Sequence, residues 1–122
     1  MERKFEHLYN DEDDILSIYD SKIKAIEFVE FSDFLDVGFS KDGGVCSLEI
    51  SDTVNFFKAI NKGINKDFLN DLNLVKIRQI LFRGVFILVL ILASNEGKMI
   101  EQSLPPLFKN EYESPLVSVL KN

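Results

Sequence analysis

The chain has 122 residues and a formal net charge of −6. A chain of this length fits a single domain over residues 1–122, and its acidic charge argues against nucleic acids and anionic membranes as partners, because both attract basic surfaces. A lone cysteine excludes an internal disulfide. The charged N-terminal segment lacks the apolar stretch of a signal peptide, so the expected location is cytoplasmic.

The N-terminal half shows the alternation of apolar and polar residues that is typical of β-strands. An acidic turn over residues 10–14 joins the first two strands, and the pair Asp42-Gly43 predicts a tight hairpin between the last two. The third strand changes its apolar face between Ile26 and Val29, which predicts a bulge or burial on both sides. Strands are expected over residues 4–9, 15–19, 23–31, 35–40 and 46–50.

Helical spacing of apolar residues replaces the alternation after Ile50. Ser51 or Asp52 can cap a first short helix, and Gly63 is expected to stop it. Asn65 can cap a second helix. The two helices are expected to cover one face of the sheet.

The run GVFILVLILA, residues 84–93, organises the C-terminal half. Ten residues without a charge fit a strand that is buried on both faces, and the run is too short for a membrane helix, which needs about 20 apolar residues. Flanking strands over residues 74–82 and 98–104 complete a three-strand antiparallel meander within residues 74–104.

The residues after the meander form a tail over residues 107–122. Pro105 and Pro106 are expected to end the sheet, because proline cannot donate a ladder hydrogen bond. The pair Ser114-Pro115 resembles the start of a helix and predicts a short one there.

Together these patterns predict an α+β fold, antiparallel and β-rich. About eight strands are expected, with two short helices between an N-terminal five-strand half and the C-terminal meander. The pattern leaves open whether the strands form one sheet or two.

Two stretches carry a family resemblance: YNDEDDILSI, from Tyr9 to Ile18, and DGGVCSLEI, from Asp42 to Ile50. They are similar to the motifs of domain of unknown function family 2283, Tyr-Asp-x-Glu-x-Asp-x-Leu-x-Ile and then an Asp-x-x-Gly turn before a Gly-Ile-Glu-Ile-like strand. The resemblance covers residues 4–57. The departures are Asn10 for the usual Asp, Ser17 for a common aromatic residue and Ser47 for the usual Gly.

What this resemblance implies about function is limited. The family has no established activity, so it implies no catalytic residues. Some of its members look like the antitoxin half of toxin pairs, which suggests a protein partner.

Few residues could carry chemistry. The acidic stretch Asp11 to Asp14 could attract a divalent cation, but it lacks the ligand spacing of a calcium loop, and a solvated turn in which Glu12 or Asp14 caps backbone N–H groups is favoured. His7 is expected to be a half-exposed strand residue and Cys46 a small core hydrophobe. No catalytic residue, metal site or cofactor is expected.

We therefore expect a non-enzymatic protein-interaction module, antitoxin-like in that it binds a basic partner protein. A homodimer is also expected, because a short chain has little material to cover both faces of residues 84–93. The alternative is a small-molecule-binding protein or enzyme with a pocket between sheet and helices lined by Glu27, Glu30 and Glu49. The candidate interaction surface consists of Asp11, Glu12, Asp13, Asp14, Asp33 and Asp36.

Overall fold

The computed structural model describes residues 2–105, 107 and 108, and of residues 82, 107 and 108 it describes the backbone alone. The helix expected near residue 114 lies outside the described residues. The elements are β1 (Glu2–Asn10), β2 (Ile15–Tyr19), β3 (Glu27–Ser32), β4 (Leu35–Phe39), β5 (Val45–Ile50), α1 (Thr53–Lys58), α2 (Lys66–Asn70), β6 (Leu72–Phe82), β7 (Val85–Ser94), β8 (Met99–Ser103) and β9 (Leu107–Phe108).

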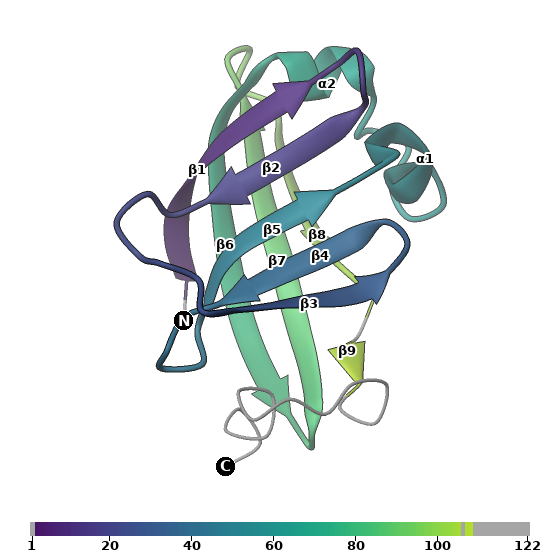
Figure 1. The fold of residues 1–122 in the computed structure, drawn as a ribbon. Helices are drawn as coiled ribbons and strands as arrows, with labels where there is room; N and C mark the ends of the chain where they lie inside the picture. Colours follow the sequence, from purple (N-terminus) through teal and green to yellow (C-terminus); the bar gives the residue numbers. More distant parts are fainter. Residues whose placement is uncertain (1, 106, 109–122) are drawn as a thin grey trace.

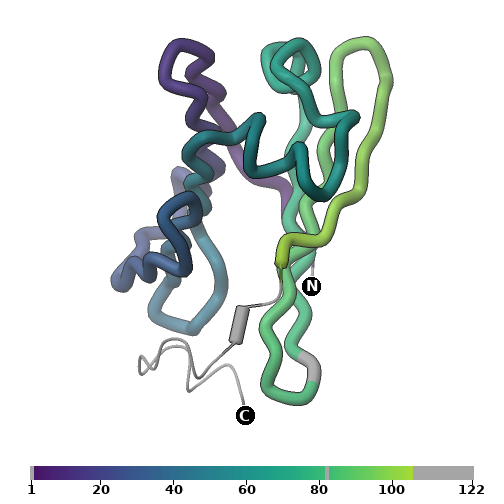
Figure 2. Tube along the Cα trace, turned by 90° about the vertical axis from the view of Figure 1, so that its right-hand side faces the viewer, coloured from purple at the N-terminus to yellow at the C-terminus, as the bar shows by residue number. Residues whose placement is uncertain are grey.

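The strands form one antiparallel sheet in the order β3-β4-β5-β2-β1-β6-β7-β8, and β9 pairs with β7. Strand β1 belongs to both halves, because Phe5 lies opposite Val75 of β6 whereas Glu6 lies opposite Tyr19 of β2. The sheet therefore curls at β1 (Figure 1) into two facing layers. Figure 2 shows these layers edge-on, with the segment that carries α1 and α2 crossing between them. The expected α+β class and the order of its parts are confirmed.

The core lies between the two layers and is filled by side chains of strands β1 to β8 and of both helices. The inward side chains of β7 are 5% exposed or less, and Phe57 of α1 and Leu69 of α2 are buried against the same core. These helices are too short to be stable alone, so their apolar residues hold them in place through packing. The inward residues of β7 are Phe86, Leu88, Leu90 and Leu92.

The outer face of β7 is covered by charged side chains of neighbouring strands. Val89 and Ile91 point outward, yet they are only 6% and 7% exposed. Arg78 lies beside Val89 and forms ion pairs with Glu2 at 3.0 Å and Glu101 at 2.7 Å. Because long charged side chains cover apolar surface with their stems, this chain covers the middle of its most apolar strand by itself.

Three predicted boundaries are wrong. Strand β3 begins at Glu27 rather than at residue 23, because the preceding residues form a turn in which Ile23 donates its N–H to the Asp20 carbonyl. Helix α1 ends at Lys58, well before Gly63. Strand β8 does end before the prolines, but the sheet resumes in β9, opposite Val85 and Phe86. No helix in the described part of the chain is long and apolar enough to cross a membrane.

Candidate interaction site

The predicted acidic turn between β1 and β2 is partly a structural joint. Asp14 adopts a left-handed backbone conformation, with φ 55°, and its carboxylate accepts hydrogen bonds from the Tyr9 hydroxyl at 2.6 Å and the Val54 N–H at 3.1 Å. Burial raises the pKa of Tyr9, and the hydrogen bond to Asp14 raises it further. The expectation that Asp14 caps a backbone N–H group is confirmed, and this carboxylate is therefore engaged within the fold.

The residues at the start of α1 form hydrogen bonds with both the β1–β2 turn and the β3–β4 turn, which lie at the same end of the sheet. Ser51 donates its N–H to the carbonyl of Phe34 in the β3–β4 turn, and Thr53 donates its N–H to the carbonyl of Asp14 in the β1–β2 turn. Asp33 therefore lies at the same end as the exposed residues Asp11, Glu12 and Asp13. Of the predicted surface, Asp36 lies apart, on the outer face of β4.

Asp36 sits in a row of three carboxylates that crosses three strands. It lies opposite Glu30 of β3 on one side and Glu49 of β5 on the other, and Ser17 of β2 continues the row beyond Glu49. Like charges in such opposed positions destabilise a sheet. Among the described residues, none of the three carboxylates forms an ion pair or a side-chain hydrogen bond. The acids on the outer face of the other layer, Glu2 and Glu101, are paired with Arg78 instead.

This row corrects one expectation. Glu30 and Glu49 are exposed on the outer face, so they do not line a pocket between the sheet and the helices. Alternation along each strand shows that the three acids point outward, but only the pairing of strands brings them together. That is why the candidate surface predicted from the sequence includes Asp36 without its two neighbours.

A second row, two residues further along the strands and on the same outer face, forms a groove. It runs from Phe28 through Gly38 and Ser47 to Tyr19, so two aromatic side chains flank a floor that carries almost no side-chain bulk. A Cβ atom on Gly38 would lie 3.0 Å from Cε1 of Phe28, which shows that the ring lies against this glycine. Phe28 is nevertheless 69% exposed and Tyr19 41% exposed. The groove has a volume of about 310 Å³, and Asp36 and Glu49 close one end.

The two rows suit a cationic side chain that has an apolar stem. Rows two residues apart along a strand are separated by about 7 Å, roughly the length of a lysine or arginine side chain. Aromatic faces attract cations, and carboxylates pair with them. Ser17 and Ser47 carry the two serine hydroxyl groups of the groove, and the residues that line the groove include no histidine or lysine that could activate either serine as a nucleophile.

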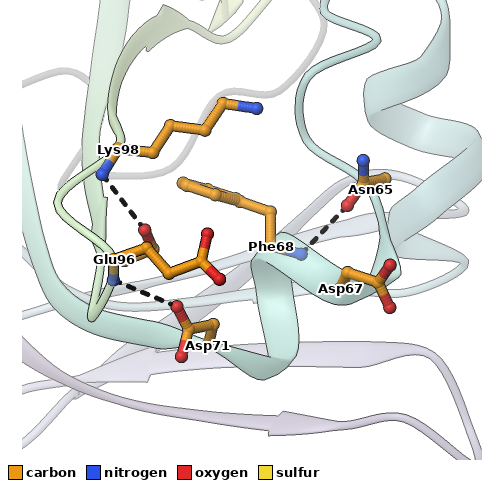
Figure 3. A pocket seen from close by; sticks show the side chains of 7 residues that line it. Asn65, Asp67, Phe68, Asp71, Glu96 and Lys98 are labelled. Atoms are coloured by element: carbon orange, nitrogen blue, oxygen red, sulfur yellow. Dashed lines mark hydrogen bonds between the residues drawn. The ribbon is translucent and has the colours of Figure 1, made fainter.

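A second hollow, of about 200 Å³, lies between α2 and the turn that joins β7 to β8 (Figure 3). The carboxylate of Asp71 accepts hydrogen bonds there from the Asn95 side chain and the Glu96 N–H. The ammonium group of Lys98 lies 5.5 Å from the Phe68 ring centre and donates to the carbonyl of Gly63. These polar groups fasten the helix to the turn, so we interpret this hollow as a structural joint.

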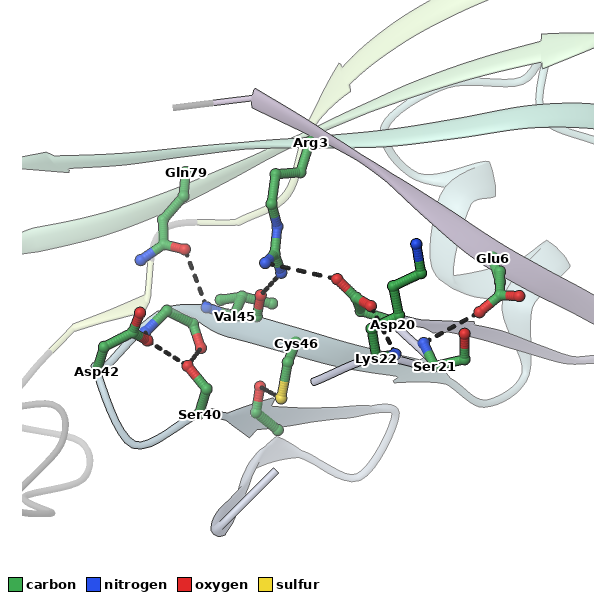
Figure 4. A network of polar contacts seen from close by, with 12 residues as sticks. Arg3, Glu6, Asp20, Ser21, Lys22, Ser40, Asp42, Val45, Cys46 and Gln79 are labelled. Atoms are coloured by element: carbon green, nitrogen blue, oxygen red, sulfur yellow. Dashed lines mark hydrogen bonds and ion pairs between the residues drawn. The ribbon is translucent and has the colours of Figure 1, made fainter. Parts of the chain in front are cut away.

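A polar network joins the two layers where β1 begins (Figure 4). Arg3 donates a 2.6 Å hydrogen bond to the carbonyl of Val45 and forms a 3.6 Å ion pair with Asp20. The side-chain oxygen of Gln79 accepts the N–H of the same Val45 at 3.0 Å. Each of these groups is used to hold β5 against β1 and β6, and the network is structural.

The remaining chemically active residues are placed as expected. His7 is half-buried on β1, and its Nε2–H donates to the carbonyl of Leu72 at 3.2 Å. Cys46 is 2% exposed with its sulfur 3.5 Å from the Gly38 carbonyl oxygen, and burial raises the pKa of its thiol. Within residues 2–105, 107 and 108, no group of three or more histidine, cysteine, aspartate or glutamate residues could hold a metal ion.

Comparison with known proteins adds no functional information. No family model, no curated protein and no solved structure matches the chain. The resemblance of residues 4–57 to family 2283 stays a prediction. The function is therefore argued from the geometry of the site.

Proposed function

We propose that this protein is a non-enzymatic interaction module of the cytoplasm, and that it binds a basic partner protein on the outer face of β2, β3, β4 and β5. One observation carries the proposal: Glu30, Asp36 and Glu49 lie side by side next to the groove between Phe28 and Tyr19, and no cation among the residues that the structure describes pairs with them. A fold gains no stability from such a row. A lysine or arginine of a partner would supply the missing charge.

The proposed binding combines two kinds of contact. The stem of the basic side chain lies over Ser47, between the aromatic rings, and its charged head reaches Asp36 and Glu49. The net charge of −6 adds a long-range attraction, which speeds encounters with a basic protein more than it tightens the complex. Binding is therefore expected to weaken as the salt concentration rises.

The more specific form of this proposal is that the basic partner protein is a toxin, as the family resemblance suggests. Co-expression with the product of the adjacent gene tests this form of the proposal, and we expect growth protection together with a stable complex. A neighbouring gene product that harms cells whether or not this protein is present would contradict it. The homodimer was expected because residues 84–93 need cover on both faces, and that reason is weaker now that Val89 and Ile91 are buried within the single chain. Light scattering of the purified protein at several concentrations tests the homodimer separately.

The binding site itself can be tested with a labelled arginine-rich peptide as the probe. We expect Glu49→Gln to weaken binding about two- to fivefold, as for an exposed ion pair, and Phe28→Ala to weaken it about tenfold, as for an aromatic anchor. Glu96→Gln is the matched control, because it removes the same charge from an exposed residue whose side chain forms no ion pair or hydrogen bond within the described residues. Equal effects of the Glu49 and Glu96 variants, measured by fluorescence anisotropy, would show that only net charge matters and would refute the site.

A further inference from the structure

The groove on the outer face of the sheet gathers hydrogen-bond acceptors around Glu49. In the pairing of the strands, Glu49 lies opposite Asp36 on one side and Ser17 on the other, and Ser47 precedes it by two residues on β5. All four residues line the groove. Because carboxylate and hydroxyl oxygens accept hydrogen bonds, the groove presents a cluster of acceptors from three neighbouring strands.

Aromatic surface lies directly beside these acceptors. Gly38 carries no side chain, and a Cβ atom there would overlap Oγ of Ser47 and lie 3.0 Å from Cε1 of Phe28. The Ser47 hydroxyl and the Phe28 ring therefore lie over the same glycine. Tyr19 of β2 borders the groove on the opposite side of Ser47. A side chain placed in the groove therefore contacts an aromatic ring and oxygen acceptors at once.

We propose that this groove selects arginine over lysine in the basic partner protein. This inference rests on the proposed function and specifies which side chain of the partner the site binds. Directly opposed residues have Cβ atoms about 4.5–5.5 Å apart, so one planar group can bridge the carboxylates of Asp36 and Glu49. The guanidinium group of arginine is planar and holds its N–H donors in a fixed fork, which lets it donate to both carboxylates and to a serine hydroxyl beside them.

A lysine side chain suits the same groove less well. Its ammonium group is a compact charge that is strongly hydrated, whereas guanidinium is more weakly hydrated and stacks on aromatic faces. Phe28 is 69% exposed and Tyr19 is 41% exposed, so water competes for any cation in this open groove. The cation that loses less on leaving water is favoured. The volume of about 310 Å³ is at the low end for ligand sites and suits one long side chain.

The test compares labelled peptides that differ only in their cationic groups. The first peptide alternates arginine and glycine, the second has lysine in place of each arginine, and the third has homoarginine, which carries a guanidinium group on the stem of lysine. We expect the arginine peptide to bind at least about fivefold more tightly than the lysine peptide by fluorescence anisotropy. The homoarginine peptide should recover most of this difference, because the guanidinium group rather than the stem length is selected.

Two variants distinguish selection by the groove from a general preference of acidic proteins for arginine. Phe28→Leu keeps an apolar side chain but removes the aromatic face, so we expect the ratio of arginine to lysine affinity to fall about twofold or more, as for a cation–π contact at an exposed site. Phe34→Leu is the matched control, because Phe34 is also exposed, at 44%, but lies in the β3–β4 turn, outside the groove lining. A ratio that is the same in wild type and both variants would overturn selection by the groove.

Failure of the selectivity can be told apart from failure of the binding site. Equal binding of the arginine and lysine peptides, with both weakened more by Glu49→Gln than by Glu96→Gln, would overturn the selectivity and leave the proposed function intact. Failure of the wild-type protein to bind any of the three peptides would overturn both proposals.

Discussion

Asp36 and Glu49 lie directly opposite each other on β4 and β5, with Glu30 on the far side of Asp36. Because opposed like charges cost a sheet roughly 0.2 to 1 kcal/mol per pair, we expect Asp36→Asn to raise the free energy of unfolding by up to about 1 kcal/mol. The gain should shrink in high salt, which screens the repulsion. Urea denaturation at low and high salt measures both, and a loss of stability at low salt would contradict the interpretation of this row.

The same substitution is expected to weaken binding of the arginine-rich peptide, so Asp36 should oppose stability while it supports binding. Glu96→Gln again serves as the control and should leave both quantities nearly unchanged. If the Asp36→Asn variant gains stability and keeps full affinity for the peptide, the carboxylate row is not part of the binding site.

Gly38 is required by crowding rather than by backbone conformation. A Cβ atom there would lie 2.1 Å from Oγ of Ser47, 3.0 Å from Phe28 and 3.1 Å from Ala25. We expect Gly38→Ala to lower the free energy of unfolding by about 1–3 kcal/mol, as for other overpacked sites. Chemical denaturation gives the value.

Ser47→Ala provides the companion variant, because it removes the closest of these atoms. Combined with Gly38→Ala, it should recover part of the loss, and the double-mutant cycle should show coupling between the two positions. Strictly additive effects would indicate that Oγ of Ser47 does not cause the destabilisation by Gly38→Ala.

The hydrogen bond from Tyr9 to Asp14 predicts a dependence of stability on alkaline pH. Tyr9→Phe should cost about 1 kcal/mol near neutral pH, where the hydroxyl is protonated and donates to Asp14. The folded state raises the pKa of Tyr9, so this contribution is complete below the unfolded pKa of about 10 and is lost as pH rises from there toward the folded value.

The measurement is the free energy of unfolding of wild type and Tyr9→Phe from neutral to strongly alkaline pH. The difference between them should narrow above about pH 10. Tyr19→Phe is the control, because Tyr19 is exposed and its hydroxyl forms no hydrogen bond with another described residue. A difference that stays constant through the alkaline range would contradict the assigned role of the Tyr9 hydroxyl.

Cys46 should report on opening of the β4–β5 region. Its thiol is buried, and burial raises its pKa, so little thiolate is available near neutral pH. We expect a soluble thiol reagent to react with it more than about a hundredfold more slowly than with an exposed cysteine introduced as Glu96→Cys in a Cys46→Ala background. Comparable rates for the two proteins would show that this part of the sheet opens readily.

Local chemistry along the chain was enough to predict most of the elements. The strand over residues 15–19 has the predicted bounds and the strand expected over residues 35–40 ends one residue early, at Phe39, because alternation and flanking turn residues mark strands within a few positions. Asn65 caps α2 as expected and accepts the Phe68 N–H at 2.9 Å, since a cap depends only on residues three positions apart. The end of α1 was missed because the carbonyl of Phe57 accepts the N–H groups of both Ile60 and Asn61 and closes the helix there.

The sequence by itself therefore determined the class of fold and the order in which strands and helices follow one another along the chain. It also determined the apolar strand of the C-terminal half and the acidic character of the surface. Each of these follows from the residue types within a short window. Only the tertiary structure decided which strands became neighbours, and with it the row of Glu30, Asp36 and Glu49 and the groove between Phe28 and Tyr19. The physical reason is that these residues come from four strands, and contact between strands depends on the pairing register across the whole sheet rather than on any local pattern.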